Sequence, residues 1–311
     1  MQSTENSKTD KDIAKFTDVI RQFVEAGDYE SAKNIEKLLH AKGLYAGSVN
    51  TEQELRKFLT QDEKMLKLKD TVRLLAPLED SVLIIGETGT GKEIIARALH
   101  GARGPYTPEK TNLEQGRFVG MACPSLSTDL MFSELFGHIK GAFTGANEDK
   151  VGKLQYAYRG TLFFDECGDM PMSMQAGLLR ALQERVITRV GCNKEIPVDF
   201  RLVCATHMDI KGMVASGKFR EDLYNRISTF ELHTTPLRER VGDIELIVKE
   251  LDKKGKFPLK EFLDKTFPHI ESIKELPADS VFIPYKRCGL PGNVRELQRL
   301  VRRFTILGTY E

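Results

Sequence analysis

The sequence contains no tryptophan, few cysteines and no long apolar run, and two of these absences exclude classes of protein. The five cysteines are widely spaced and odd in number, which fits reduced thiols and provides no zinc-ligand spacing. No run of about 18 apolar residues occurs, so we expect no membrane span. The N-terminus is polar and lacks an apolar signal core, so we expect a cytoplasmic protein. We attach no function to the missing tryptophan.

An excess of charge of either sign is also missing. Lys and Arg number 46 against 45 Asp and Glu, which gives a formal net charge of +1. This balance argues against a protein that coats nucleic acid and against an acidic tail. The 311 residues are enough for two domains of roughly 150 residues with a small extension.

The pattern along the chain predicts three segments. Residues 1–60 form a helical extension, in which apolar residues recur at spacings of three and four between residues 12 and 43 and predict a helical hairpin. This hairpin either packs on the main domain or acts as a regulatory or dimerising module. Thr51 opens a third helix, with Glu54 placed for a capping box. Residues 61–235 form an α/β core, and residues 236–311 form a helical lid with a Pro-rich interruption near residues 268–291.

Three short apolar runs in the core predict buried parallel strands that alternate with helices. They cover residues 81–85, 161–164 and 200–205. Polar residues follow each run, and ligands of such sheets collect at the carboxyl ends of the strands. We therefore expect the functional site at this edge.

The first run leads into a glycine-rich loop of the form G-x-x-x-x-G-K. Its backbone N–H groups can surround phosphate oxygens, and the helix that follows adds a favourable dipole. Lys92 is expected to reach the β- and γ-phosphates of ATP. Glu93 stands where a serine or threonine usually contacts Mg²⁺. The residues predicted to bind the nucleotide here are Gly86, Glu87, Thr88, Gly89, Thr90, Gly91, Lys92 and Glu93.

The second and third runs supply the candidate catalytic groups. Asp165 is expected to hold Mg²⁺, and Glu166 to polarise the attacking water as general base. Thr206 and His207 end the third run, where a polar side chain could sense the γ-phosphate or simply cap the strand.

Three arginines are further candidates. Arg220 or Arg226 could neutralise charge on the transferred phosphate across a subunit boundary, although neither is distinguishable by sequence from an ordinary surface arginine. Arg295, in the last apolar helix, could reach back to the nucleotide from the lid.

Residues 62–307 resemble the central AAA+ domain of the sigma-54-dependent transcriptional activators, the bacterial enhancer-binding proteins. The most specific motif is GAFTGA, which in that family engages sigma-54. We expect a slender loop with Phe143 as an exposed aromatic anchor. The alternative is a glycine-rich connection with a buried phenylalanine. The motif comprises Gly141, Ala142, Phe143, Thr144, Gly145 and Ala146.

Other segments resemble the family's Walker A, Walker B, arginine-finger, lid and sensor II motifs in order. The Walker A of the family also carries glutamate after the lysine, as at Glu93. The resemblance implies a P-loop ATPase with ATP and Mg²⁺ that forms a ring, usually a hexamer. It further implies that the protein remodels the sigma-54 RNA polymerase holoenzyme.

The chain also departs from the family at four positions. Ala122 replaces an asparagine that couples the catalytic glutamate to the rest of the subunit, and His207 replaces the sensor I asparagine. Ile139 and Leu290 replace a glutamate and a tryptophan. These changes motivate an alternative function, a nucleotide-sensing binding protein with little turnover. A second alternative is a remodelling ATPase with a different client.

No phosphoacceptor receiver pattern precedes the core, and no helix-turn-helix follows the lid. We expect either a piece of a longer protein or an activator without a DNA anchor of its own. Any DNA contact is then weak or indirect.

Overall fold

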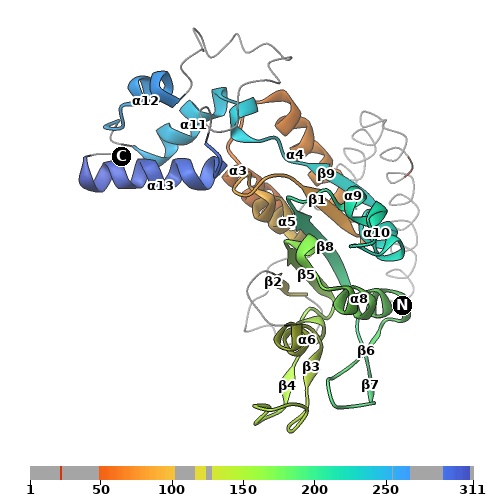
Figure 1. The fold of residues 1–311 in the computed structure, drawn as a ribbon. Helices are drawn as coiled ribbons and strands as arrows, with labels where there is room; N and C mark the ends of the chain where they lie inside the picture. Colours follow the sequence, from red (N-terminus) through yellow and green to blue (C-terminus); the bar gives the residue numbers. More distant parts are fainter. Residues whose placement is uncertain are drawn as a thin grey trace, which may run out of the picture.

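The computed structural model describes Gln22 and residues 49–101, 116–123, 128–253, 255–266 and 290–308. Apart from Gln22, the predicted hairpin lies outside these residues, as does most of the Pro-rich interruption. Figure 1 shows a central sheet flanked by helices, with a helical lid at one end and two β-hairpins at the other.

The central sheet has five parallel strands in the order β2-β5-β8-β1-β9. Their bounds are β1 Val82–Ile85, β2 Phe118–Ala122, β5 Gly160–Asp165, β8 Phe200–Thr206 and β9 Phe230–His233. The three predicted strands are the three central ones. The two edge strands, β2 and β9, were not predicted from the sequence. The α/β class and the P-loop architecture are therefore confirmed.

Alternate side chains of each central strand enter two separate cores. Leu162 and Phe164 pack on one face with α6, α8 and α10, whereas Phe163 packs on the other with α3, α4 and α5. This alternation follows from the two-residue period of a strand. The helices of these layers are α3 Val49–Lys57, α4 Glu63–Leu75, α5 Lys92–His100, α6 Thr128–Phe136, α7 Lys153–Tyr156, α8 Met172–Glu184, α9 Ile210–Ala215 and α10 Glu221–Ile227.

Helix α3 begins at Val49, so the expected start at Thr51 with a capping box is wrong. The Thr51 hydroxyl instead donates to the carbonyl of Ala98 at 3.0 Å, and Glu54 pairs with Lys57. Tertiary contact with α5 therefore replaces the local cap.

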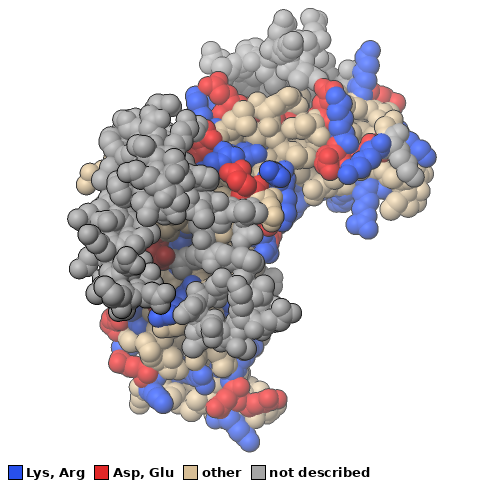
Figure 2. Space-filling model, turned by 180° about the vertical axis from the view of Figure 1, so that it is seen from behind, with Lys and Arg blue, Asp and Glu red and all other residues tan. Residues whose placement is uncertain are grey.

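The lid has its own apolar core. Leu237, Ile244, Phe262, Leu297 and Val301 lie within it. Its elements are the 3₁₀ turn Leu237–Glu239, α11 Gly242–Leu251, α12 Leu259–Thr266 and α13 Asn293–Leu307. Figure 2 shows basic and acidic side chains interspersed over the described part of the rear face, in keeping with the balanced charge.

Two small antiparallel hairpins project from the end of the molecule remote from the lid (Figure 1). One pairs β3 Gly137–His138 with β4 Lys150–Val151, and the other pairs β6 Val186–Thr188 with β7 Glu195–Pro197. Reciprocal backbone hydrogen bonds join the two hairpins, because Ile139 N–H donates to Val190 and Val190 N–H donates to Gly137.

Within these described ranges, no helix is both long enough and apolar enough to cross a membrane. The thiols of Cys123, Cys167, Cys192 and Cys204 are free, and Cys288 lies outside the described residues.

Candidate nucleotide-binding site

The glycine-rich loop lies where the sequence predicts it, between β1 and the first residue of α5. Gly89 and Gly91 have φ of +81° and +106°, a region that favours glycine. A Cβ at Gly89 would collide with the carbonyl of Gly292 in the lid, so glycine also permits close approach of the lid backbone. The loop N–H groups and the N-terminus of α5 form a site suited to phosphate.

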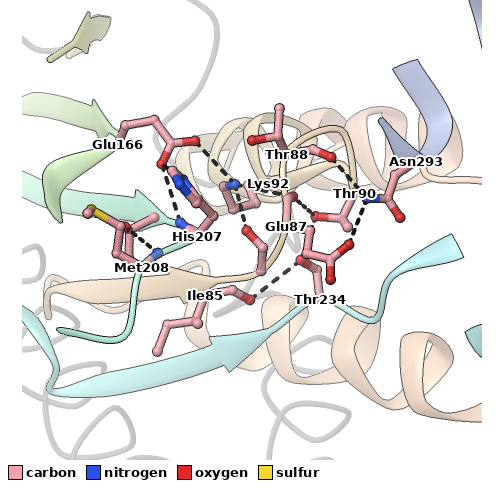
Figure 3. Close-up of polar contacts among 12 residues, drawn as sticks. Ile85, Glu87, Thr88, Thr90, Lys92, Glu166, His207, Met208, Thr234 and Asn293 are labelled. Carbon is pink, nitrogen blue, oxygen red and sulfur yellow. Dashed lines mark hydrogen bonds and ion pairs between the residues drawn. The ribbon is translucent and has the colours of Figure 1, made fainter. Parts of the chain in front are cut away.

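Lys92 lies within the loop in the structure. Its Nζ donates to the carbonyls of Gly86 and Glu87 at 2.7 and 3.3 Å and lies 3.6 Å from Oε1 of Glu166 (Figure 3). The ammonium is buried, and it donates to carbonyl oxygens of the loop. A bound nucleotide would offer it phosphate oxygens in their place.

Asp165 and Glu166 lie at the carboxyl end of β5 and face the same cavity as Lys92. Glu166 has a left-handed backbone with φ +53°. Burial, and then the charge of Glu166, raise the pKa of Asp165. A divalent cation would relieve this repulsion between neighbouring carboxylates, so the donor set fits Mg²⁺.

No group of three or more His, Cys, Asp or Glu side chains in the described part of the chain could hold a metal alone. Mg²⁺ commonly takes one or two carboxylates and completes its shell with water and phosphate oxygens. Asp165 therefore suits a cation that arrives with a nucleotide.

The two candidates at the end of β8 differ in their surroundings. Thr206 is fully buried, and its hydroxyl accepts from the N–H of Met208 at 3.0 Å. His207 is half-exposed, and its Nδ1 lies 2.7 Å from Oε2 of Glu166. The structure therefore brings His207, rather than Thr206, into contact with the candidate general base.

Glu87 points toward the lid. Its carboxylate accepts two hydrogen bonds from Arg238, both at 2.7 Å, and a third from Asn293 at 3.2 Å. Asn293 also donates to the carbonyl of Thr88 and accepts from the N–H of Leu237. Glu87 thus ties the loop to the lid, a role that its position in the motif did not predict.

The cavity at this edge has a volume of about 310 Å³. Arg295 lines it together with the loop and both carboxylates. Its other end is lined by apolar side chains, which suit a nucleotide base and which were not predicted from the sequence. These are Phe58, Leu59, Ile247, Leu251 and Val294. The spacing of four between Ile247 and Leu251, which places both on one face of α11, was the pattern in the sequence that could have indicated this apolar surface.

Arg220 and Arg226 do not line this cavity. Arg220 precedes α10 and pairs with the carboxylate of Asp222 at 3.0 and 2.7 Å. Arg226 donates to the carbonyl of Leu182 at 3.5 Å. Within a single chain, neither arginine therefore lies with the predicted site residues that line the cavity.

Residues 141–146 form the tip of the β3–β4 hairpin, remote from the cavity. Gly141 and Gly145 have φ of +81° and +101°, with open space around both. The Phe143 ring is half-buried and packs edge-on against His138 at 5.0 Å between centroids. The expectation of an exposed aromatic is therefore wrong, because this ring contact covers part of the side chain.

The loop at the end of β1, the acidic end of β5 and the helical lid define a P-loop NTPase of the AAA+ class. The crystal structure of NtrX from Brucella abortus in complex with ATP is similar, with a TM-score of 0.61 at 28% identity over 89% of this chain and 57% of that chain.

Sequence comparison narrows the class. The model of the sigma-54 interaction domain matches residues 58–233. The formate hydrogenlyase transcriptional activator FhlA of Escherichia coli (strain K12) is 40% identical over 258 residues, 83% of this chain and 34% of that protein. The response regulator protein PilR of Pseudomonas aeruginosa is 40% identical over 247 residues, 79% of this chain and 51% of that protein.

The chain belongs to the family of proteins with a sigma-54 interaction domain, which confirms the resemblance seen in its motifs. It spans about a third to a half of the length of these two curated relatives.

Proposed function

We propose that this protein hydrolyses ATP and uses the energy to remodel the RNA polymerase holoenzyme that contains sigma-54. The observation that carries the proposal is the cavity in which the phosphate loop, two carboxylates and Arg295 face one another. Loop N–H groups and Lys92 would bind the phosphates, and Glu166 would accept the proton of the attacking water. The apolar end of the cavity would receive the base.

Asp165 would hold Mg²⁺, which supplies charge neutralisation on the transferred phosphate when bound. The place of this carboxylate in the lining of the cavity, beside Glu166 and across from the phosphate loop, supports the assignment. Removal of Mg²⁺ by EDTA should therefore stop turnover.

The proposed ATP site is tested directly by the Lys92→Ala variant. We expect it to lose ATP binding, because the ammonium group that contacts the phosphate loop is removed. Lys67→Ala, which changes an exposed lysine of α4, is the matched control. Unchanged ATP affinity of the Lys92 variant would contradict the assignment.

We propose that the subunits form a ring, with six as the expected number, and that Arg220 or Arg226 completes the site of a neighbour. The absence of both arginines from the lining of the cavity of their own chain supports this proposal. Each arginine is replaced by alanine and the variant is mixed with Glu166→Gln. An arginine that acts across the boundary should regain turnover in the mixture, because some sites then combine intact groups from two inactive subunits. An arginine that acts within its own subunit should show no such recovery.

We propose that residues 141–146 contact sigma-54. Their position at the tip of a projecting hairpin, together with family membership, supports this role. Phe143→Ala should retain ATP turnover and lose promoter opening, whereas Tyr156→Ala, which changes an exposed aromatic elsewhere, should retain both. Normal promoter opening by the Phe143 variant would remove the loop from the mechanism. Turnover without any sigma-54 binding would indicate a different client.

A nucleotide-sensing protein with slow turnover is the second candidate. The observation that favours it is the engagement of Glu166 by both Lys92 and His207. Tight ATP binding without turnover at any protein concentration would establish this alternative.

A further inference from the structure

The carboxylate of Glu166 is held from the β8 side of the sheet. Its Oε2 lies 2.7 Å from Nδ1 of His207 and 3.3 Å from the backbone nitrogen of the same residue (Figure 3). An ionised carboxylate can only accept hydrogen bonds, so Nδ1 of His207 carries the proton and donates it. One residue thus supplies two donors to one carboxylate oxygen.

The strand on the other side of β5 supplies no such donor. The register places Ala122 of β2 beside Asp165, and a methyl group cannot form a hydrogen bond. Of Ala122, the last residue of β2, and His207, the residue that follows β8, only His207 can therefore orient Glu166 through a polar contact.

The contact with Lys92 differs from that with His207. The Lys92 ammonium lies 3.6 Å from Oε1 and is also bound to two loop carbonyls. When this ammonium turns to the phosphates of ATP, Glu166 loses its partner on Oε1. The hydrogen bonds from His207 to Oε2 do not depend on that movement, so they remain to fix the carboxylate.

The backbone that carries His207 is itself joined to the phosphate loop. The carbonyl of Thr206 accepts a hydrogen bond from the N–H of Gly86 at 3.0 Å, and the hydroxyl of Thr206 accepts from Met208. Position 207 therefore has a fixed place relative to the loop. A side chain there can set the direction of Glu166 relative to a bound phosphate.

We propose that His207 is the positioning residue for Glu166, and that it fixes the carboxylate by a hydrogen bond from β8 in place of one from β2. This inference rests on the proposed ATPase activity. His207 contacts neither the phosphate nor the water in this role and acts only through the general base. Its loss should slow the chemical step and leave nucleotide binding intact.

The test measures kcat for ATP and, separately, the affinity for ATP by equilibrium binding. His207→Ala should lower kcat on the order of 10- to 100-fold, the cost of misplacing a catalytic group by about 1 Å. Its ATP affinity should stay within about twofold of wild type, which also shows that the variant is folded. The matched control is His233→Ala, which changes an exposed histidine at the end of the neighbouring strand β9 and should leave kcat unchanged.

Rescue distinguishes positioning from a structural role. His207→Asn keeps an N–H donor and should retain more of kcat than His207→Ala. The double variant Ala122→Asn/His207→Ala places an amide at the opposite flank of β5 and should recover most of the lost kcat.

Wild-type kcat in His207→Ala would overturn the proposal, as would a loss that appears in ATP affinity instead of kcat. A double variant no faster than His207→Ala would also contradict it. Failure of the proposed function has a different signature, since the wild-type protein itself would then bind ATP without turnover.

Discussion

Arg201 offers a quantitative test of how the core is assembled. It lies on β8 with a fully buried side chain, and its guanidinium donates to four backbone carbonyls. Three of these belong to the C-terminal ends of α4 and α5, namely Leu75, Ala76 and Leu99, each at 2.9 Å. The fourth is Asp80 at 3.1 Å. The cation therefore satisfies carbonyls that a helix leaves without partners, at the end where positive charge is favoured.

The expected cost of Arg201→Met follows from these contacts. A buried group left without its partner costs about 1–3 kcal/mol, and relaxation of the helix ends would recover part of that sum. We expect the variant to lose about 4 kcal/mol of unfolding free energy, a large share of the roughly 5–15 kcal/mol typical of a folded protein. Arg201→Lys should lose about half as much, because one ammonium keeps the charge but cannot span all four carbonyls.

Urea denaturation followed by circular dichroism measures these differences. Arg185→Met is the matched control, since that arginine is half-exposed and donates to a single carbonyl, that of Phe200. It should change the unfolding free energy by about 0.5 kcal/mol or less. A loss below about 1 kcal/mol in Arg201→Met would refute the reasoning, because water or repacking would then have satisfied the carbonyls.

Three further predictions concern pH, the lid and the projecting hairpin. Burial, then Arg201 and Arg97, lower the pKa of His100 to about 4 from 6.5. The folded protein favours neutral His100, so this contribution to stability is complete above pH 6.5, and about 3 kcal/mol of unfolding free energy is lost as the pH falls to 4. In His100→Gln, the difference in unfolding free energy between urea denaturations at pH 7 and pH 4 should be smaller by about this amount. Asn293→Gly removes the hydrogen bonds from Asn293 to Glu87 and Thr88 of the loop and should raise the Kd for ATP about tenfold, which corresponds to about 1.4 kcal/mol of binding free energy. Because φ at this position is +50°, the unfolding free energy of Asn293→Ala should be about 1 kcal/mol lower than that of Asn293→Gly. Gly191→Ala should keep ATP turnover but weaken sigma-54 binding in a pull-down, since its Cβ would lie 2.8 Å from that of Ala142.

The central strands could be predicted because they are buried on both faces. β8 is buried at every position and β5 at all but its last, and such strands appear as continuous apolar runs. The edge strands lack this signature. β2 contains Gly120 and is only partly buried, and β9 alternates buried and more exposed residues. Their place in the sheet is decided by pairing with β5 and β1, which the sequence does not display.

The same distinction applies to the candidate site. The glycine loop and the pair Asp165-Glu166 are local patterns, each contained in a few residues. The contacts of Glu87 with Arg238 and Asn293 join residues 151 and 206 positions apart. Spacing along the chain gives no signal for such contacts, so Glu87 was assigned to the nucleotide rather than to the lid. The contact of Phe143 with His138 was not predicted although it is local, because a slender loop with an exposed ring was expected from the small residues of the motif.

The lid contacts one side of the phosphate-loop peptides, and a bound nucleotide would use the opposite side. Residues 88–90 accept hydrogen bonds at their carbonyls from Asn293, from the N–H of Val294 and from the guanidinium of Arg240. Phosphates bind such loops through N–H groups, so ATP need not displace the lid in order to enter. If nucleotide binding shifts the loop, the hydrogen bonds from Asn293 and Val294 would move α13 with it, and Arg295 lies on the same helix. The lid is therefore placed to follow the state of the loop, as the proposed remodelling activity would require.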